Sequence, residues 1–419
     1  MKTTTVFTYI IAALCLASCA SEVTTQSPLE PGGPAKPRQY ISLTAGEQAV
    51  LSGNNAFAFN LLRTAAADAA HDNLLLSPLS LSLALAMLDN GADGETHDEL
   101  RTALGFGQAS REDINGYFGK ITTALREADN YAAFENANSI WIAQNLPVYE
   151  SFKTANRDAF DAEIRSFDNA DIPKAIKQIN AWCAAKTRNL IPKLLDESNE
   201  AIMYIINALY FKASWTHRFD AAQTAPADFR NADGSTAKIP TMKLTGKLNY
   251  AATDGFELLS LPYGNGSFAL TLLLPADGTT AAEVVCTLDD DAWSDCLSHM
   301  RQRQIILSLP RFKTEYSRTL NEDLKEMNMR SMFTGLADFS RISSRPLFVS
   351  FVKQKTFLTV DEEGSEAAAA TVIGMLETAL PDNNPDAPRE MRFDRPFAYF
   401  ITEESTGSII FAGLAQQLK

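Results

Sequence analysis

The segment from Phe348 to Leu380 constrains the fold most, because its two halves require different structures. Up to Val360 the residues alternate in a pattern typical of a partly buried strand. The side chains then become small, with four alanines from Ala367 to Ala370, and this part has no fixed local preference. A proline-rich stretch from Pro381 to Pro388 follows and excludes regular structure. Unstructured segments of this length in compact domains are usually functional or disordered, so we interpret it as a long loop that can become a strand.

The composition indicates a large acidic globular protein. The chain has 419 residues, of which 46% are hydrophobic, and a formal net charge of −14. This length is sufficient for a large core. The acidic balance argues against nucleic acid and against anionic membrane surfaces as partners. It also argues against a heparin-type cofactor, which would need a clustered basic face.

Helical patterns dominate the first part of the chain and strand patterns dominate from Ile202 onward. The expected helices cover residues 46–70, 78–88, 95–104, 152–160, 172–188, 283–300 and 320–327. The expected strands cover residues 73–76, 134–143, 202–211, 238–242, 248–251, 256–262, 268–274, 304–310, 348–360, 393–400 and 409–413. There is no regular alternation of strand and helix and no internal repeat, which favours a single α+β domain.

The N-terminal segment has the features of a secretory signal. Lys2 provides a positive start, and Val6 to Leu16 is mostly apolar but too short for a finished spanning helix. The sequence Leu16-Ala17-Ser18-Cys19 resembles a bacterial lipoprotein box, in which the cysteine is lipidated and becomes the mature N-terminus. An ordinary cleavable signal with an incidental cysteine is the alternative.

The lipoprotein interpretation divides the chain into three parts. Residues 1–19 are the signal peptide, residues 20–45 form a flexible tether rich in Pro, Gly, Ser and Thr, and residues 46–419 form the folded domain. It predicts a protein anchored by lipid at Cys19 to the bacterial cell envelope. The anchor would be on the outer membrane or cell surface, on the extracellular or periplasmic side.

The residues that could bind metal or perform catalysis form no known motif. Cys183, Cys286 and Cys296 cannot all pair internally, and their spacing fits no zinc or redox site. Buried free thiols are expected, with a Cys286–Cys296 disulfide as the alternative. The chain lacks nucleophile-elbow, zinc-protease and phosphate-loop motifs, so neither a metal nor a cofactor is predicted. A hydrolase with a spatially assembled triad is the weakest hypothesis.

Several blocks, in the right order, resemble the serpin family of protease inhibitors. They are NLLLSPLS (73–80), NALYFKASW (207–215), LPRF (309–312), LADFS (336–340) and FDRPF (393–397). The resemblance implies the serpin fold, a single domain with three β-sheets, about eight or nine helices and an exposed reactive-centre loop at about residues 362–390. It implies a monomeric inhibitor, not an enzyme. Its partner would be a serine or sometimes a cysteine endopeptidase, trapped covalently by insertion of the loop into the largest sheet.

The small residues after the strand resemble the hinge of this loop. The hinge residues are Glu362, Glu363, Gly364, Ser365, Glu366, Ala367, Ala368, Ala369, Ala370 and Thr371. On insertion, alternate side chains must enter the core. The alternate residues from Ser365 to Met375 carry neither charge nor proline, whereas Glu366, which belongs to the other alternate set, would face water. Because burying a lone carboxylate costs several kcal/mol, this pattern favours the inhibitory mechanism over a non-inhibitory serpin-like binding protein or chaperone.

The bond that the protease would cleave is less well defined by the sequence. Family spacing counted from Glu362 implies the bond between Thr378 and Ala379, which suggests an elastase-like target. A shift of a residue or more would use Glu377, Leu376 or Met375 instead, for a glutamyl-specific or chymotrypsin-like protease. The physiological protease stays open at this point.

Family residues that control opening of the sheet correspond to Ser77, Ser80, Asn207, Trp215 and Gln354. Ser77 also fits the role of a helix N-cap, and Trp215 that of an ordinary core residue. Gln354 departs from the family pattern, where histidine is usual. A glutamine can still donate and accept hydrogen bonds, but it does not support pH-dependent opening at this position.

Overall fold

The computed structural model describes residues 36–69, 71–196, 201–365 and 388–419. Nine α-helices and two short 3₁₀ helices occur within these ranges. The helices are α1 (Ala45–Asp68), α2 (Pro78–Asp89), α3 (Gly94–Ala103), α4 (Arg111–Glu127), α5 (Glu150–Phe160), α6 (Ile172–Lys186), η1 (Ala221–Gln223), α7 (Ala281–Thr287), α8 (Asp290–Ser298), α9 (Asn321–Glu326) and η2 (Ser331–Phe333). The strands are β1 (Leu74–Leu76), β2 (Ala132–Ala143), β3 (Glu163–Phe167), β4 (Met203–Ser214), β5 (Ala225–Arg230), β6 (Thr236–Ala252), β7 (Phe256–Tyr263), β8 (Phe268–Pro275), β9 (Arg301–Pro310), β10 (Phe312–Thr319), β11 (Lys353–Val360), β12 (Gly364–Ser365), β13 (Arg389–Arg392), β14 (Phe397–Glu403) and β15 (Ser408–Ala415).

The described strands form three sheets. A nine-stranded sheet has the order β1-β15-β14-β8-β7-β6-β9-β13, with β5 paired to β6 outside this path. A four-stranded sheet has the order β12-β4-β2-β3, and β10 and β11 form a separate antiparallel pair. The α+β class, the three sheets and the helix count of the implied serpin fold are therefore confirmed.

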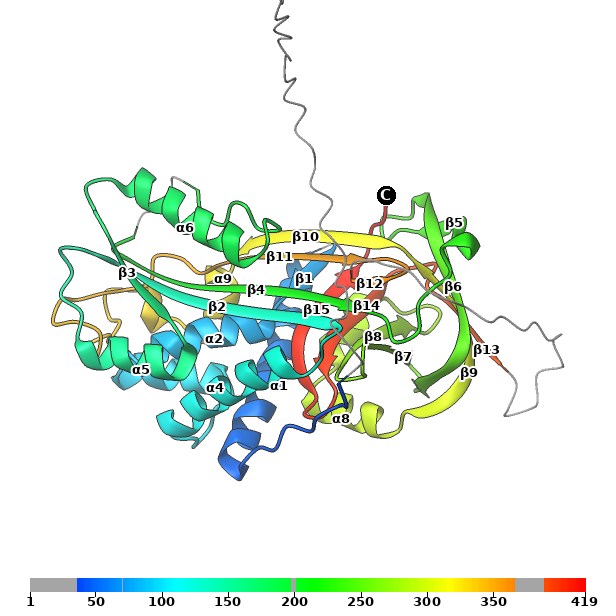
Figure 1. Ribbon diagram of the computed structural model, residues 1–419, viewed down its shortest axis with the longest axis horizontal. Helices are drawn as coiled ribbons and strands as arrows, with labels where there is room; N and C mark the ends of the chain where they lie inside the picture. The colour runs from blue at the N-terminus through cyan, green and yellow to red at the C-terminus, as the bar shows by residue number, and fades with distance from the viewer. Residues whose placement is uncertain (1–35, 70, 197–200, 366–387) are drawn as a thin grey trace, which may run out of the picture.

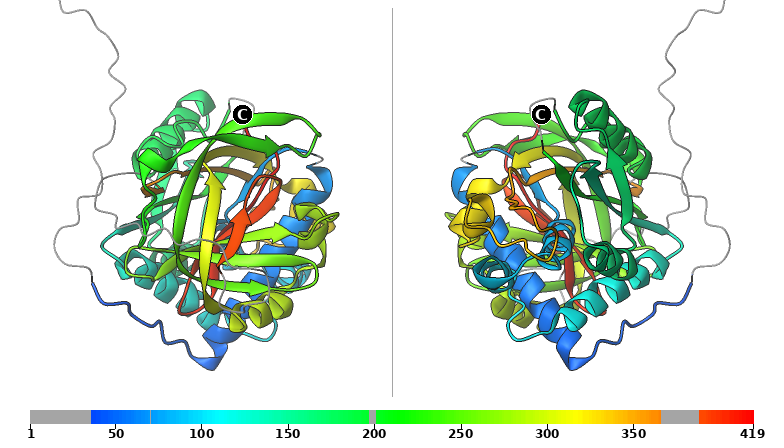
Figure 2. Two further views of the ribbon diagram at one scale, coloured as in Figure 1. Left: turned by 90° about the vertical axis from the view of Figure 1, so that its right-hand side faces the viewer. Right: turned by 90° about the vertical axis from the view of Figure 1, so that its left-hand side faces the viewer.

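Helices cover both faces of the four-stranded sheet. Figure 1 shows α6 on one face of β2 and β4, and α1, α2, α4 and α5 on the other. Strands β6, β9 and β13 of the nine-stranded sheet lie at the opposite end of the molecule from α5 (Figure 1), the end that faces the viewer in the left panel of Figure 2. Because β4 has helices on both faces, most of its residues are buried, as the continuous apolar pattern from Ile202 predicts.

Helix α2 lies in the middle of this arrangement. Ser77 is its N-cap, with Oγ accepting from the Ser80 amide at 3.4 Å, and Pro78 occupies the first turn. Eleven of its twelve residues are buried, because it packs against α1, β4 and β15. The predicted N-cap role of Ser77 is confirmed.

Several predicted elements differ from the structure. The strand predicted from residue 348 begins only at Lys353, and Phe348 is 60% exposed. The two strands predicted within residues 238–251 are one continuous strand, β6. The helix predicted over residues 283–300 is interrupted at Leu288, whose backbone is extended, and so forms α7 and α8. Helix α4 and strands β3, β5 and β10 have no counterpart among the predicted elements.

The chain before α1 is held against the folded body. The amide of Lys36 donates to Asn130 Oδ1 at 3.0 Å, and the amide of Ile41 donates to Ser405 Oγ at 3.0 Å. The last residues of the segment predicted as a tether, 36–44, therefore have fixed contacts. No helix within the described residues is long and apolar enough to cross a membrane.

The cysteines of the folded body are free thiols, which confirms that part of the prediction. Cys183 and Cys296 are buried, and burial raises the pKa of the Cys183 thiol to about 12. Cys286 is exposed, so its predicted burial is wrong. It lies near the end of α7, on a turn that the core does not cover.

Candidate functional site

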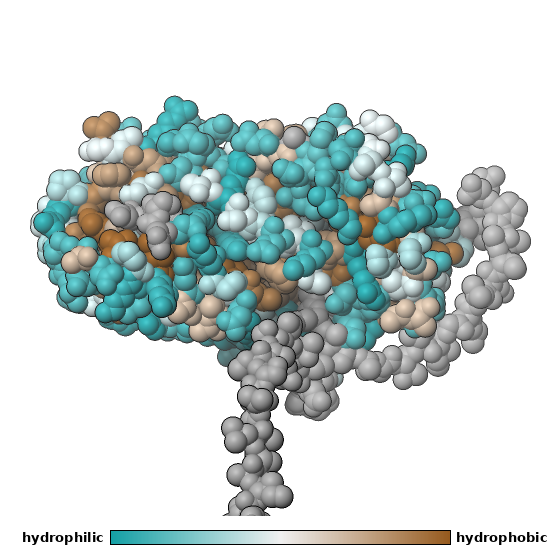
Figure 3. All heavy atoms as spheres, turned by 90° about the horizontal axis from the view of Figure 1, so that it is seen from above, coloured by the Kyte–Doolittle hydropathy of each residue, from teal (hydrophilic) through white to brown (hydrophobic). Residues whose placement is uncertain are grey.

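The four-stranded sheet and the β10–β11 pair lie edge to edge, with β4 and β11 facing each other but not paired, and we call the two together the divided sheet. Within the described residues β4 pairs with β2 along its length and with β12 at its end, whereas β11 pairs only with β10. A cavity of about 180 Å³ lies between the two parts. Its lining includes Leu81 and Leu85 of α2, Ile205 and Leu209 of β4, and Gln354 of β11. Apolar residues also interrupt the polar surface on the face seen from above in Figure 3.

A new strand begins at one end of this division. Gly364 and Ser365 form β12, which pairs antiparallel with Ser214 and Ala213 of β4. Gly364 has a φ of 137°, and a Cβ there would lie 2.1 Å from the carbonyl oxygen of Ala213. Only glycine fits this close approach, so the chain can turn from β11 into a position beside β4 at this residue.

The backbone before β12 is held by an aromatic residue of the sheet. The Nε1 of Trp215 donates to the carbonyl of Asp361 at 2.8 Å, and its amide donates to the carbonyl of Glu363 at 3.0 Å. The ring of Trp215 stacks on Tyr263 with centroids 4.4 Å apart. Trp215 is therefore a core residue that also fixes the start of the loop.

The side chain of Glu362 is the polar centre of the hinge. It is 5% exposed, and its Oε1 accepts from Arg311 Nε at 2.7 Å and from the Thr224 hydroxyl. Burial alone would raise the pKa of Glu362, but the hydrogen bonds from Arg311 and Thr224 outweigh it, and the pKa lies below its ordinary value. Glu362 is thus a buried carboxylate that depends on its partners.

The two neighbouring carboxyl groups have the opposite shift. Burial raises the pKa of Asp361, with a further contribution from Glu362, and burial together with Asp361 raises the pKa of Glu363. An acid whose pKa is raised in the folded state destabilises that state above the pKa, and this cost is relieved as the pH falls through it. The charged forms of Asp361 and Glu363 therefore destabilise the folded state.

We expect Asp361→Asn to raise the midpoint of thermal unfolding by a few degrees at pH 7.5. The amide oxygen of asparagine can still accept from the Glu363 amide, as Asp361 Oδ1 does at 3.0 Å, but it carries no buried charge. The gain should disappear at about pH 3, because the raised pKa of Asp361 leaves its carboxyl group largely protonated in the wild type at that pH. Differential scanning calorimetry at both pH values measures this, and an equal gain at both would contradict it.

Four of the five sheet-opening candidates lie together at the start of α2. Gln354 accepts from the Ser77 amide at 3.0 Å and donates to the Ser77 carbonyl at 2.9 Å. The Ser80 hydroxyl donates to Asn207 Oδ1, and Asn207 Nδ2 donates to Asn138 at 2.7 Å. The first turn of α2 is therefore bonded to both sides of the divided sheet, to β11 through Gln354 and to β4 through Asn207. The fifth candidate, Trp215, lies at the hinge instead.

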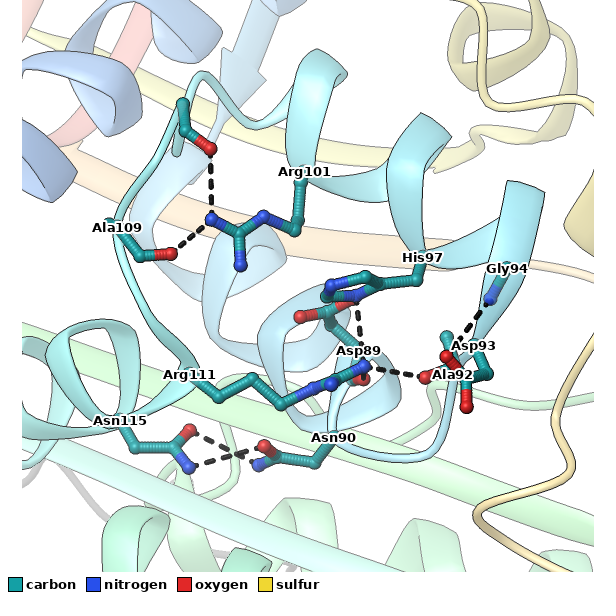
Figure 4. A network of polar contacts seen from close by, with 11 residues as sticks. Asp89, Asn90, Ala92, Asp93, Gly94, His97, Arg101, Ala109, Arg111 and Asn115 are labelled. Atoms are coloured by element: carbon teal, nitrogen blue, oxygen red, sulfur yellow. Dashed lines mark hydrogen bonds and ion pairs between the residues drawn. The ribbon is translucent and has the colours of Figure 1, made fainter.

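A second polar network fixes the other end of α2 (Figure 4). Asp89, the last residue of this helix, is 2% exposed and pairs with His97 Nδ1 of α3 at 2.5 Å. Arg111, at the start of α4, donates to the carbonyl of Ala92 at 2.6 Å and lies 3.0 Å from the same His97 nitrogen. Burial raises the pKa of Asp89 against the opposing effect of His97. With both ends bonded, α2 can act as a fixed support beneath the divided sheet.

Part of the predicted site lies outside the described residues. These residues are Glu366, Ala367, Ala368, Ala369, Ala370 and Thr371 of the hinge, Met375, Leu376, Glu377, Thr378 and Ala379 of the predicted cleavage region, and Cys19. Within the described residues, no group of three or more His, Cys, Asp or Glu side chains is arranged to hold a metal ion.

Two functional side chains were not among the predicted site residues. Arg311 and Thr224 both bond to Glu362, from 51 and 138 positions away in the chain. Arg311 lies between β9 and β10, and its side chain is 45% exposed. It belongs to the LPRF block (309–312), which is the sequence signal that could have identified it.

The divided sheet, with the two-residue strand β12 started on the free edge of β4, is the arrangement that distinguishes this α+β fold. A family model described as serpin (serine protease inhibitor) matches residues 52–417. The chain belongs to the serpin family.

Individual relatives support this assignment. Iripin-2 from Ixodes ricinus is 31% identical over 382 residues, which cover 89% of this chain and 95% of the relative. An uncharacterized serpin-like protein from Methanosarcina mazei is 30% identical over 374 residues, which cover 87% of this chain and 86% of that protein. The native structure of the thermophilic serpin tengpin superposes with a TM-score of 0.80 at 29% identity, covering 91% of this chain and 98% of tengpin.

Proposed function

We propose that this serpin inhibits serine endopeptidases, and some cysteine endopeptidases, as a suicide substrate. The observation that carries the proposal is β12. Its two residues already pair with the end of β4, and the position next to them between β4 and β11 is not occupied by any described strand. A strand continued from Ser365 would fill this position.

The register of β12 supports insertion of the predicted hinge. Since Ser365 pairs with Ala213, each further residue of an antiparallel strand would lie opposite the preceding residue of β4. Ala367 would then lie opposite Phe211, and Thr371 opposite Asn207. Phe211 packs against Phe268 and Phe411, and Asn207 bonds to Ser80, so this parity faces the core. The uncharged parity of the hinge is the one that would be buried.

The proposed mechanism is a competition between two reactions of the acyl-enzyme. The serine Oγ or cysteine Sγ of the protease attacks the carbonyl carbon of the scissile residue, and the amine of the next residue leaves with a proton. The segment before the cleaved bond is then free to insert beside β4 while still esterified to the protease. If insertion is faster than attack by water, the protease is carried away from its productive geometry and remains bound.

We place the scissile bond between Thr378 and Ala379, which favours an elastase-like target. Cleavage after Glu377, Leu376 or Met375 remains within the proposal and would indicate a glutamyl-specific or chymotrypsin-like protease. The support for these positions is the family spacing from Glu362 alone. Mass spectrometry of the released C-terminal fragment identifies the bond.

Incubation with elastase-, chymotrypsin-, trypsin- and papain-like proteases tests the function. We expect at least one of them, with the elastase-like enzyme the first candidate, to form a complex that survives boiling in denaturing detergent. Its mass should equal that of the protease plus the serpin without the released fragment. Cleavage of the loop by every protease without any such complex would contradict the proposal.

A non-inhibitory binding protein is the second candidate, and one relative gives it a specific basis. Thyroxine-binding globulin, solved as a complex with thyroxine, is 25% identical to this chain with a TM-score of 0.78. Loop cleavage separates the two functions. An inserting serpin gains an additional strand and should become much more heat-stable on cleavage, whereas a non-inserting one should not.

The sequence supports two further parts of the proposal. From the lipoprotein box we propose that the mature protein is tethered by lipid at Cys19 to the exported side of a bacterial envelope. A monomer is proposed because the mechanism requires one free loop per domain. In this location the inhibitor would protect a cell surface from external proteases.

A further inference from the structure

A cavity of about 600 Å³ lies beside the hinge, where β6, β10 and β11 meet the C-terminal residues 417–419. It shares no lining residue with the cavity between β4 and β11. Figure 1 shows the C-terminal end of the chain at the top of the view, on the side of β5 and β10. We call this space the hinge cavity, because Asp361 and Arg311 line it. Its volume is within the range of small-molecule sites.

Hydrogen bonds fix the walls of the hinge cavity. Asn73 Oδ1 accepts from the amides of Gln416 and Gln417 at 2.7 and 2.8 Å, which holds the C-terminal residues against the start of β1. The Arg311 amide donates to the carbonyl of Pro240 at 2.8 Å, which joins the start of β10 to β6. The cavity is therefore formed before any ligand binds, and a ligand need not order its walls.

The buried part of the lining is apolar. Its side chains are each at most 5% exposed and belong to Ile239, Phe312, Val360 and Leu418. Small-molecule sites usually combine such a lining with a few polar groups that orient the ligand. An apolar group of a ligand would contact these side chains and be removed from water, which favours binding.

The remaining lining carries two charges of each sign. Asp72, Lys313 and Lys419 are exposed, and Asp361 is half-buried. Within the described ranges none of these four side chains forms an ion pair, although Lys313 Nζ lies over an aromatic ring at 5.0 Å. Lys313 is opposite Thr359, two residues before Asp361, so a lysine and a carboxylate lie near each other without a bond between them. A ligand with one positive and one negative group would pair with charges of both kinds.

Asp361 is the residue through which the hinge cavity acts on the hinge. Its carbonyl accepts from Trp215 Nε1 at 2.8 Å, and its Oδ1 accepts from the Glu363 amide at 3.0 Å. Arg311, which also lines the cavity, is bonded to Glu362 instead. Because burial raises the pKa of Asp361, its charged form destabilises the folded state. A cationic group bound beside Asp361 would offset that cost.

We propose that the hinge cavity binds a free α-amino acid with an apolar side chain. The ammonium group of the ligand bonds to Asp361 and lies near Asp72, its carboxylate pairs with Lys313 and Lys419, and its side chain packs on the buried apolar lining. A ligand with a single charge would leave the lining charges of the other sign unpaired. Occupancy stabilises the hinge of the uncleaved protein. The site is independent of the proposed inhibitory function.

Isothermal titration calorimetry of the full chain at neutral pH tests the site, with L-phenylalanine and L-leucine as the probes. We expect at least one of them to bind with a dissociation constant of about 1 mM, the range expected for so small a ligand. N-acetyl-L-phenylalanine lacks the ammonium group, L-phenylalaninamide lacks the carboxylate and glycine lacks the apolar side chain. Each of these three should bind about tenfold more weakly.

Two variants and a matched control locate the binding. Lys313→Glu and Asp361→Asn should each weaken it about tenfold, because each removes a charge that pairs with the ligand. Lys243→Glu makes the same charge change as Lys313→Glu on an exposed position of β6 that does not line the cavity, and the affinity should not change. The amino acid that binds should also raise the midpoint of thermal unfolding of the wild type more than that of Asp361→Asn.

The absence of binding by both amino acids would overturn the inference. Equal affinities for the wild type, Lys313→Glu and Asp361→Asn would do the same, and so would equally tight binding of a singly charged derivative. Since Asp361→Asn is expected to be at least as stable as the wild type, unfolding does not explain a loss of binding in that variant. None of these measurements requires a covalent protease complex, so the site and the inhibitory mechanism fail separately.

Discussion

Ala367→Arg is expected to convert the protein from an inhibitor into a substrate. In the register set by β12, residue 367 would enter the core opposite Phe211, where no water can solvate a guanidinium. The cost of burying an unpaired charge is several kcal/mol. If about 3 kcal/mol of it is felt in the insertion step, insertion slows about 100-fold and hydrolysis of the acyl-enzyme wins. Titration of protease activity should show many inhibitor molecules cleaved per protease inactivated.

A residue exchange provides the control for this prediction. Glu366→Ala/Ala367→Glu keeps the composition and moves one carboxylate by a single position onto the core-facing parity. We expect this double variant to be a substrate as well, whereas Glu366→Ala alone should remain an inhibitor. Stable covalent complexes with Ala367→Arg on a denaturing gel would show that insertion does not take place in this register.

Glu362→Lys is expected to destabilise the uncleaved protein by about 2 to 3 kcal/mol. The new ammonium group would lie beside Arg311, and the hydrogen bonds that Arg311 and Thr224 donate would be lost from a site that is 5% exposed in the wild type. At about 2 °C per kcal/mol, the unfolding midpoint should fall by about 5 °C. Thermal unfolding followed by circular dichroism measures the change.

Two further variants isolate the ion pair. Glu362→Lys/Arg311→Glu restores opposite charges at the same positions and should recover part of the lost stability. Glu315→Lys disrupts the 3.1 Å pair between Glu315 of β10, whose side chain is 51% exposed, and Lys355 of β11, and should cost less than about 1 kcal/mol. An equal loss for Glu315→Lys and Glu362→Lys would mean that burial of the hinge pair contributes nothing.

The local part of the candidate site could be predicted from the sequence, but its partners could not. The small residues from Gly364 onward indicate a segment without a fixed local preference, their resemblance to the serpin hinge implies its role, and the structure begins a strand at Gly364. Arg311 and Thr224 contact Glu362 only because β10, η1 and the end of β11 meet in space. No spacing along the chain encodes that meeting.

The secondary structure could likewise be predicted from the sequence only in part. The apolar run of β4 and the Ser-Pro start of α2 were sufficient to predict both elements. The middle of β6 could not be predicted as a strand, because Lys243 and Lys247 face outward and the strand is maintained by backbone bonds to β9. In contrast, α4 has a recognisable signal, a capping box between Ser110 and Asp113.

The cavity between β4 and β11 also affects how the molecule responds to pressure. About 180 Å³ of internal space would be lost when a strand fills the divided sheet. Pressure favours the state of smaller volume, so compression acts in the same direction as loop cleavage and shifts the uncleaved chain toward the inserted form. The hydrogen bonds of Ser77 with Gln354 and of Ser80 with Asn207, at the start of α2, oppose that shift. Under the proposed inhibitory mechanism, the space that would admit the cleaved loop would therefore also allow the uncleaved chain to lose activity without meeting a protease.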